Sequence, residues 1–101
     1  DYDRFRHLNL FDGKKIFEKI DVSDFEKIEE IIKNLEPETV INAAGVIKQL
    51  PSAGNVINTL EINSIFPQKM AIIAKKLDFR FINISTDCVF DGKKGFYSET
   101  D

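Results

Sequence analysis

Apolar residues recur at steps of three and four along the stretch that follows Ser23. These positions are Phe25, Ile28, Ile31, Ile32 and Leu35. Their spacing predicts an amphipathic helix with one apolar face turned to a core. Ser23, with Glu26 three positions later, predicts a capping box at the helix start. Pro37 predicts the helix end, because the residue before a proline is kept away from helical dihedral angles.

Three short apolar stretches predict β-strands. The first lies within 14–22 and contains Ile16, Phe17, Ile20 and Val22. The other two, 39–42 and 79–84, are short and lie next to turn residues, which is typical of buried parallel strands.

A second helical stretch is predicted from Asn55 to Leu77, where the apolar positions mostly keep helical steps. Pro67 lies inside it and predicts either a kinked helix or two abutting helices. Residues 1–13, 46–54 and those after 87 are predicted to be loops. The predicted elements alternate along the chain as strand, helix, strand, helix and strand. This order predicts parallel strands joined by right-handed crossovers, and therefore the α/β fold class.

Length, composition and charge limit the classes of protein to which this chain can belong. The 101 residues suit one domain, and 43% hydrophobic with 31% charged residues is ordinary globular composition. A net charge of −3 argues against a nucleic-acid partner. The apolar runs are too short to span a membrane, and no secretion leader is expected. A single cysteine, Cys88, excludes an intrachain disulfide and favours a reducing, cytoplasmic location.

The candidate chemistry lies where the predicted strands end, because ligands of open parallel sheets bind at the carboxyl ends of strands. Asn42-Ala43-Ala44-Gly45 would let a flat ligand approach the backbone, with the glycine allowing the turn; tight packing on a helix explains it equally well. Ser85-Thr86-Asp87 could hydrogen-bond a substrate oxygen and assist proton transfer, or could form a local turn.

Other polar residues carry weaker signals. Asp21 could accept a hydrogen bond from an adenine or a ribose, or could serve the start of the helix. Asn63 lies inside a helical stretch, where asparagine has a poor propensity, so it is either a buried member of a hydrogen-bond network or a solvated residue. His7 is interpreted as a surface residue and Cys88 as a buried structural thiol. The sequence shows no metal-ligand spacing.

Three motifs together carry a family resemblance. They are Ile41-Asn42-Ala43-Ala44-Gly45, then Glu61-Ile62-Asn63 with Pro67, and then the string from Ile84 to Gly92 (ISTDCVFDG) with Tyr97 and Glu99 after it. From about Asp21 to the end, the chain resembles the extended short-chain dehydrogenases/reductases, and among them the dTDP-4-dehydrorhamnose reductase branch. The resemblance implies part of a Rossmann-type, doubly wound parallel sheet that binds NADP or NAD.

The resemblance also implies roles for individual residues. The implied cofactor-binding residues are Asp21 and Val22 beside the adenine, Asn42, Ala43, Ala44, Gly45 and Val46 along the ribose and nicotinamide path, Asn63 as a support, and Ser85 near the nicotinamide. Thr86 would be catalytic, because its hydroxyl would bond the reacting sugar oxygen and tune the proton donor. Asp87 and Cys88 would face the sugar. Many members of the branch have tyrosine where this chain has Cys88, which leaves the exact sugar open.

Two family motifs are missing from these 101 residues. The glycines, at 13, 45, 54, 92 and 95, form no G-x-x-G-x-x-G turn for a pyrophosphate. The Tyr-x-x-x-Lys pair is also missing, since Arg6 follows Tyr2 and Asp101 follows Tyr97 at that spacing. In the family, the first motif lies upstream of this stretch and the second downstream. Residues 1–101 are therefore expected to be an internal part of an NAD(P)-binding Rossmann domain.

The expected parent is an NAD(P)H-dependent reductase of a nucleotide-linked 4-keto deoxysugar, and the 101 residues alone are expected to be inactive. Two alternatives stay open: another extended short-chain dehydrogenase or epimerase acting on nucleotide sugars, and a non-catalytic nucleotide-binding module. The sequence also leaves open the choice between NAD and NADP and the oligomeric state, a homo-oligomer included.

Overall fold

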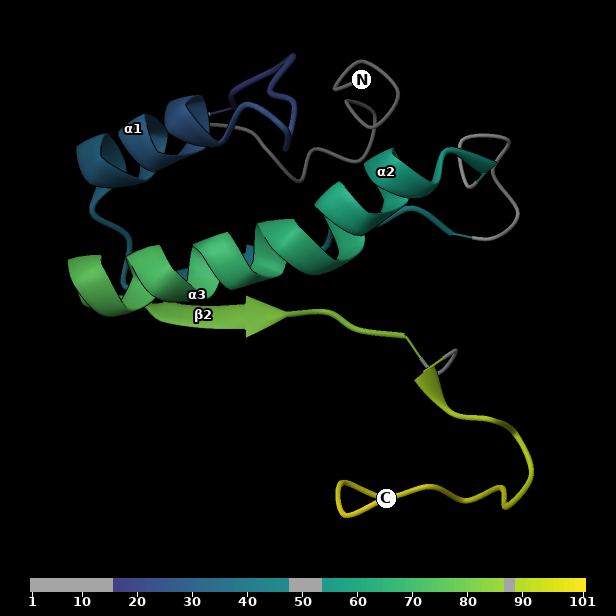
Figure 1. Cartoon of the computed structure of the whole chain (residues 1–101). Coiled ribbons are helices and arrows are strands. Elements are labelled where there is room, and N and C mark those ends of the chain that lie inside the picture. Colours follow the sequence, from purple (N-terminus) through teal and green to yellow (C-terminus); the bar gives the residue numbers. More distant parts are fainter. Residues whose placement is uncertain (1–15, 48–53, 87–88) are drawn as a thin grey trace, which may run out of the picture.

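The computed structural model describes residues 16–47, 54–86 and 89–101. Its elements, in chain order, are α1 (Phe25–Leu35), β1 (Thr39–Asn42), α2 (Val56–Leu60), the π-helical segment η4 (Glu61–Ile65), α3 (Phe66–Leu77) and β2 (Arg80–Asn83). Figure 1 shows α2, η4 and α3 as one long helical rod, with α1 on one side of α3 and β2 running along the other. The α/β class and the two predicted helical stretches are confirmed.

The two strands pair in parallel, as predicted, but the prediction that they are buried is wrong: of their eight residues only Asn42 is buried. The register sets Thr39 opposite Arg80 and Asn42 opposite Asn83. Backbone hydrogen bonds extend the pairing beyond both ends, from Arg80 N to Glu38 O at 2.9 Å and from Ile84 N to Asn42 O at 2.9 Å. Strand β2 is thus shorter than the predicted 79–84, although Ile84 still contributes its amide to the ladder.

The strand predicted at 14–22 is wrong for the residues that the structure describes. Residues 16–22 form no strand, and the sheet contains only β1 and β2 within the described part of the chain. Lys19 has a φ of 58°, which interrupts an extended backbone in the middle of the stretch. Residues 14 and 15, the predicted loop at 1–13 and 48–53 of the predicted loop at 46–54 lie outside the described residues.

Helix α1 begins one residue later than the predicted capping box would place it. The cap is Asp24, whose Oδ1 accepts from the Lys27 amide at 3.2 Å. Ser23 instead donates its amide and hydroxyl to Asp21 Oδ1, at 2.9 and 2.7 Å. The capping box at Ser23 is therefore wrong, because a carboxylate two residues upstream takes its hydrogen bonds. The helix ends at the left-handed Glu36 (φ 45°), just before Pro37, as predicted.

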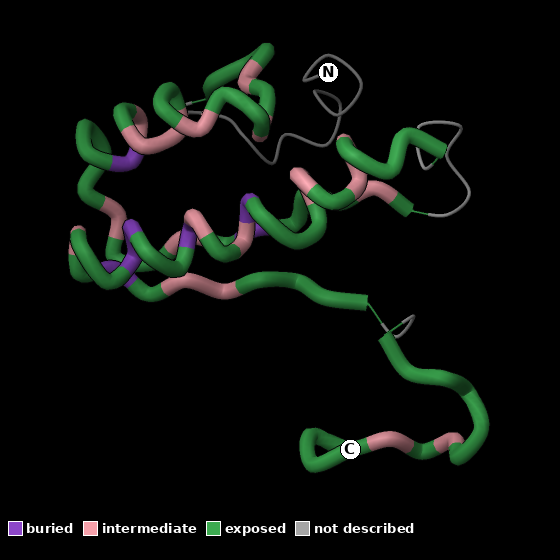
Figure 2. Tube along the Cα trace, viewed as in Figure 1, coloured by how far each residue is buried: buried purple, intermediate pink, exposed green. Residues whose placement is uncertain are grey.

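The hydrophobic core lies between α1, α3 and one face of the strand pair. Its buried residues are Ile32, Phe66, Met70, Ile73, Ala74 and Phe79, and Figure 2 shows the buried positions concentrated on α1 and α3. Phe25 meets Phe66 edge to face, with ring centroids 6.2 Å apart. Val40 and Phe81, opposite each other in the sheet, pack against this cluster and join the strands to the helices.

The predicted interruption of the second helix takes the form of a π-helical turn. The Phe66 amide donates to the Glu61 carbonyl, five residues earlier, where an α-helix would use a carbonyl four residues earlier. Pro67 follows directly and has no amide hydrogen to offer Asn63, so the α-helical ladder is already broken at this point. The rod continues as α3 to Leu77 and ends at the left-handed Asp78.

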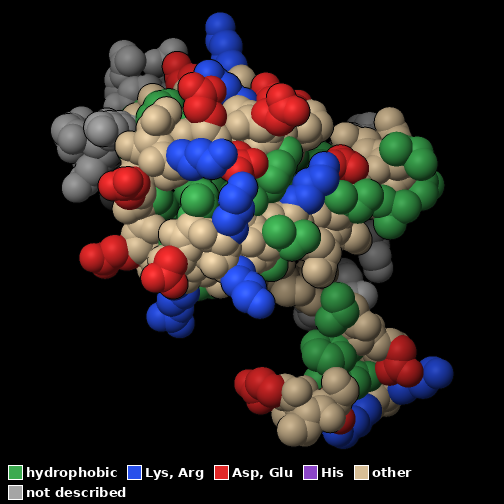
Figure 3. Space-filling model, turned by 60° about the vertical axis from the view of Figure 1, so that its left-hand side comes forward, with side chains coloured by type: hydrophobic (Ala, Val, Ile, Leu, Met, Phe, Trp, Pro, Cys, Tyr) green, Lys and Arg blue, Asp and Glu red, His purple; other side chains and the backbone are tan. Residues whose placement is uncertain are grey.

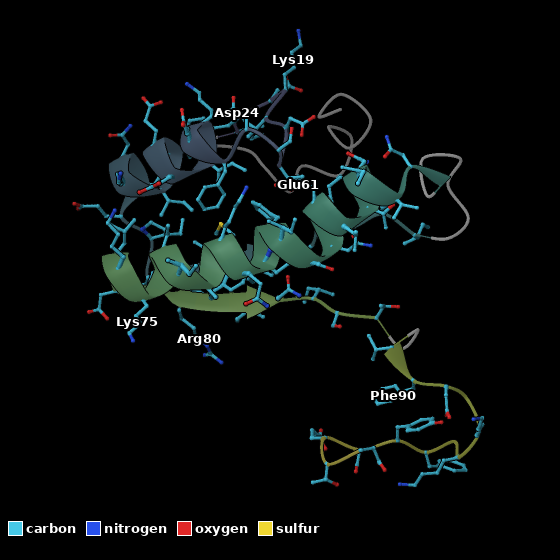
Figure 4. All side chains as sticks on the ribbon, in the orientation of Figure 1. Lys19, Asp24, Glu61, Lys75, Arg80 and Phe90 are labelled. Atoms are coloured by element: carbon cyan, nitrogen blue, oxygen red, sulfur yellow. The ribbon has the colours of Figure 1, made fainter. Side chains whose placement is uncertain are left out.

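Residues 89–101 form a turn stabilised by local contacts, apart from the helices and the sheet in Figure 1. The rings of Phe90 and Tyr97 stack with centroids 4.4 Å apart, and Phe90 is labelled in Figure 4. Asp91 Oδ1 accepts from the Tyr97 hydroxyl at 2.6 Å and from the Lys93 amide at 3.0 Å. These hydrogen bonds, that from Tyr97 first, favour the carboxylate and lower the pKa of Asp91 below its ordinary 3.8.

We expect this turn to loosen in acid. A carboxylate whose pKa is lowered in the folded state stabilises that state above its unfolded pKa, and this contribution is lost as the pH falls below 3.8. Carboxyl NMR titration should give a pKa for Asp91 below 3.8, and Tyr97→Phe should move it back towards that value. Asp21, whose pKa is lowered by Ser23, serves as the unaffected control. An Asp91 pKa that is the same in both proteins would contradict this account.

Candidate functional site

The carboxyl ends of β1 and β2 lie side by side, because the strands are parallel and in register at Asn42 and Asn83. The segments that leave these ends, 43–46 and 84–86, therefore start at the same edge of the sheet (Figure 1). Half of the residues predicted to form the site belong to these two segments, namely Ala43, Ala44, Gly45, Val46, Ser85 and Thr86. The sequence-based prediction that they come together is consistent with this topology.

Asn42 connects the two strand ends. It is buried, and its Nδ2 donates to Asn83 Oδ1 at 2.7 Å across the sheet. Its Oδ1 accepts from the Ala44 amide at 3.1 Å and so holds the start of the following turn. The role of Asn83 was not predicted. The sequence did contain a signal, because both strands end in asparagine and equal strand lengths place these residues opposite each other.

Asn63 holds the other end of the turn. Its Oδ1 accepts from the Val46 amide at 2.8 Å, and its Nδ2 donates to the Val46 carbonyl at 2.8 Å. Such a double contact satisfies both backbone groups of one residue and fixes the turn relative to the rod. The sequence left open a buried network member or a solvated residue. The structure supports the hydrogen-bond network but not the burial, since Asn63 is exposed.

Between these two anchors, Ala43, Ala44 and Gly45 are exposed. Gly45 was expected to allow the turn, but it is not among the residues with positive φ, so the turn does not use the left-handed conformation that a glycine adopts freely. A Cβ added at Gly45 would meet Asn63 Oδ1 at 3.6 Å, which is ordinary van der Waals contact. Neither backbone conformation nor local packing therefore requires a glycine here.

The second segment presents hydroxyl groups. Ser85 and Thr86 follow β2 after one intervening residue, Ile84, and are exposed. Asp87 and Cys88, predicted to face a sugar, lie outside the described residues, as does His7. The prediction of a buried Cys88 thiol stays a prediction for the same reason.

Asp21 and Val22 have local roles in the structure. The hydrogen bonds from the hydroxyl and amide of Ser23 lower the pKa of the exposed Asp21, which keeps a carboxylate just before α1. Val22 packs against the core cluster. The Asp21 carboxylate thus accepts hydrogen bonds from Ser23, while Asp24 caps the helix. Both the helix-start role and the cofactor contact of Asp21 stay predictions.

The rest of the described surface was compared with two other kinds of site, a metal centre and a membrane-spanning helix. Acidic and basic side chains are interspersed on the face that Figure 3 shows. Within 16–47, 54–86 and 89–101, no three His, Cys, Asp or Glu side chains are grouped as metal ligands would be. The helices in that part of the chain are also too short or too polar to cross a bilayer.

Comparisons with known proteins find relatives of the sequence and of the fold. Two curated relatives are each 31% identical: "Probable low-salt glycan biosynthesis reductase Agl14" of Haloferax volcanii, over 82% of this chain, and the dTDP-4-dehydrorhamnose reductase of Aggregatibacter actinomycetemcomitans, over 84%. The crystal structure of a hypothetical dTDP-4-dehydrorhamnose reductase from Sulfolobus tokodaii is also 31% identical. It superposes with a TM-score of 0.75, covering 86% of this chain and 33% of that one.

The chain spans only 28% and 29% of the lengths of the two curated relatives. The family described as the RmlD substrate binding domain matches residues 7–101, which is nearly the whole sequence. The match includes both strand-end segments and the rod that carries Asn63. On this evidence, the chain belongs to the RmlD substrate binding domain family.

Proposed function

We propose that the protein carrying this chain is an NAD(P)H-dependent reductase that reduces the 4-keto group of a nucleotide-linked deoxysugar. Both curated relatives are named as reductases, and one of them as a dTDP-4-dehydrorhamnose reductase, which supports the reductase part. The observation that carries the proposal is the exposed turn 43–46, held by Asn42 at one end and Asn63 at the other. It lies at the carboxyl edge of a parallel sheet, where such folds bind dinucleotides.

The residues of the turn fit a flat ligand. Ala43, Ala44 and Gly45 are small and exposed, and nothing in the fold requires the glycine. A close approach of the cofactor to the backbone explains why no larger side chain stands there. In the proposal, these residues with Val46 and Ser85 line the ribose and nicotinamide, and NADPH or NADH supplies the hydride.

Thr86 is the proposed catalytic residue of this chain. Its hydroxyl follows β2 at the same edge as the turn, where it can donate a hydrogen bond to the reacting sugar oxygen. Asp87 and Cys88 are proposed to contact the sugar. The general acid is proposed to be a tyrosine of a Tyr-x-x-x-Lys pair elsewhere in the parent, because these 101 residues contain no such pair.

The chain is proposed to be part of a Rossmann-type domain. Val40 and Phe81 pack on the core, so the alternating side chains of the strands point to the opposite face. On that face, Ile41 is 62% exposed, and Ile84, just beyond β2, is 59% exposed. Parallel sheets are normally covered on both faces, so this apolar face supports a larger, doubly wound parent. We further propose a cytoplasmic protein, in line with the single cysteine of these 101 residues.

The function is tested by incubating the intact parent protein with NADPH or NADH and 4-keto-6-deoxysugars linked to dTDP, UDP or GDP. We expect hydride transfer to C4 of the sugar, with an alcohol as the product. The 101 residues alone should show no turnover. Epimerised sugar without net cofactor oxidation would favour an epimerase, and cofactor binding without turnover would favour a non-catalytic module; either result would overturn the reductase proposal.

Gly45→Ala should separate cofactor binding from folding. The added methyl group makes only ordinary contacts within the chain, so the melting temperature should not change. A methyl group on the path of the ligand should raise the Kd for NADPH about tenfold. Gly54→Ala, at a position with nothing within 4 Å of the added Cβ, is the matched control. Unchanged NADPH affinity in Gly45→Ala would remove the turn from the cofactor site.

Thr86→Ala should affect the chemical step. Loss of the hydroxyl group is expected to lower kcat by about 100-fold, with little change in the KM for NADPH. Thr86→Ser keeps the hydroxyl and should retain most of the activity. Equal losses in the two variants would indicate that the methyl group of Thr86, and not its hydroxyl, is what matters.

A further inference from the structure

Glu61 and Lys69 form an ion pair across the π-helical turn of the rod. Lys69 Nζ lies 2.9 Å from Glu61 Oε1, and the two side chains are 41% and 31% exposed. The same Nζ lies 5.5 Å from the centroid of the Phe25 ring, which brings the pair against α1. Figure 4 shows Glu61 on the side of the rod turned towards the start of α1.

This pairing depends on the wide turn between the two residues. Each residue of an α-helix advances by about 100°, so positions eight apart differ by about 80° in direction and positions seven apart by about 20°. The bond from the Phe66 amide to the Glu61 carbonyl adds one residue to the turn. Lys69 therefore stands where the seventh residue after Glu61 would stand, on the same face and two turns away.

The same wide turn carries Asn63. Downstream of it, Phe66 and Met70 are buried in the core and set the orientation of α3. If η4 reverted to an α-helical turn, the residues before Phe66 would rotate by about 100° relative to α3. Asn63 would then lose its two contacts with Val46.

We propose that Glu61 and Lys69 are a positioning pair, which stabilises the π-helical turn and so directs the Asn63 amide to Val46. Pro67 weakens the α-helical alternative at the same place, because it has no amide to donate to the Asn63 carbonyl. The effect of the ion pair on the π-helical turn and on Asn63 does not depend on what the protein binds. Its effect on the shape of a cofactor-binding turn rests on the proposed function.

The test measures, by NMR of the intact parent protein, the hydrogen-exchange rate of the Val46 amide and the signal of the Asn63 side-chain amide. Glu61→Gln and Lys69→Met should each speed hydrogen exchange of the Val46 amide about threefold, the size of effect that a partly exposed ion pair supports. The double variant should be no worse than either single variant, because both remove the same interaction. Lys69→Arg should keep the slow exchange and the Asn63 signal.

Lys76→Met is the matched control. Lys76 is also on α3 and pairs with Glu29 of α1 at 3.5 Å, but this pair does not span the π-helical turn. The Lys76→Met variant should leave the hydrogen-exchange rate of the Val46 amide and the NMR signal of the Asn63 side-chain amide unchanged. Unchanged exchange in Glu61→Gln, additive effects in the double variant, or an equal effect of Lys76→Met would each overturn the proposal.

A second measurement separates this inference from the proposed function. Glu61→Gln should also raise the Kd for NADPH about threefold, in proportion to the loosened turn. If the parent does not bind NADPH at all, the proposed function fails, and the exchange data still decide whether the pair positions Asn63. If NADPH binds and the Kd is unchanged in Glu61→Gln although exchange is faster, the pair does not shape the cofactor turn.

Discussion

Asn42 is buried where β1 ends, and a buried amide left without partners would cost about 1–3 kcal/mol. Its side chain makes two hydrogen bonds. Its Nδ2 donates to Asn83 Oδ1 across the sheet, and its Oδ1 accepts from the Ala44 amide in the following turn. The same contacts hold the strand ends together and determine how the chain leaves the sheet. The shape of the candidate site therefore depends on the buried Asn42 amide, because the fold has to provide hydrogen-bond partners for it.

The helical rod supplies the second constraint. Its buried residues bind α3 to the core, and its π-helical turn presents Asn63 to the backbone of Val46. The turn 43–46 is thus held at both ends by asparagine amides from different elements. This leaves the small residues between them exposed and in a defined place, an arrangement that suits a ligand better than a flexible loop would.

The predictions that succeeded rest on local periodicity. Helix α1 and strand β1 appeared close to their predicted bounds, because the apolar spacing and Pro37 act within a few residues. The errors arose where two local rules compete. Ser23 suits a capping box, but Asp21 takes its hydrogen bonds and Asp24 caps the helix. Likewise, the apolar residues of 16–22 suit a strand, but Lys19 adopts a left-handed conformation.

The sequence by itself determined the α/β order and the strand-end motifs that identify the family, because each depends on residues close together in the chain. The alternation of strands and helices in turn predicted that the two strands are parallel. Only the tertiary structure decided that Asn42 pairs with Asn83, 41 residues away, and that Asn63 binds Val46, 17 residues away. Partners so distant are selected by strand register and by the rotation of the rod at its π-helical turn. Both depend on packing between elements, which the periodicity of a single segment does not record.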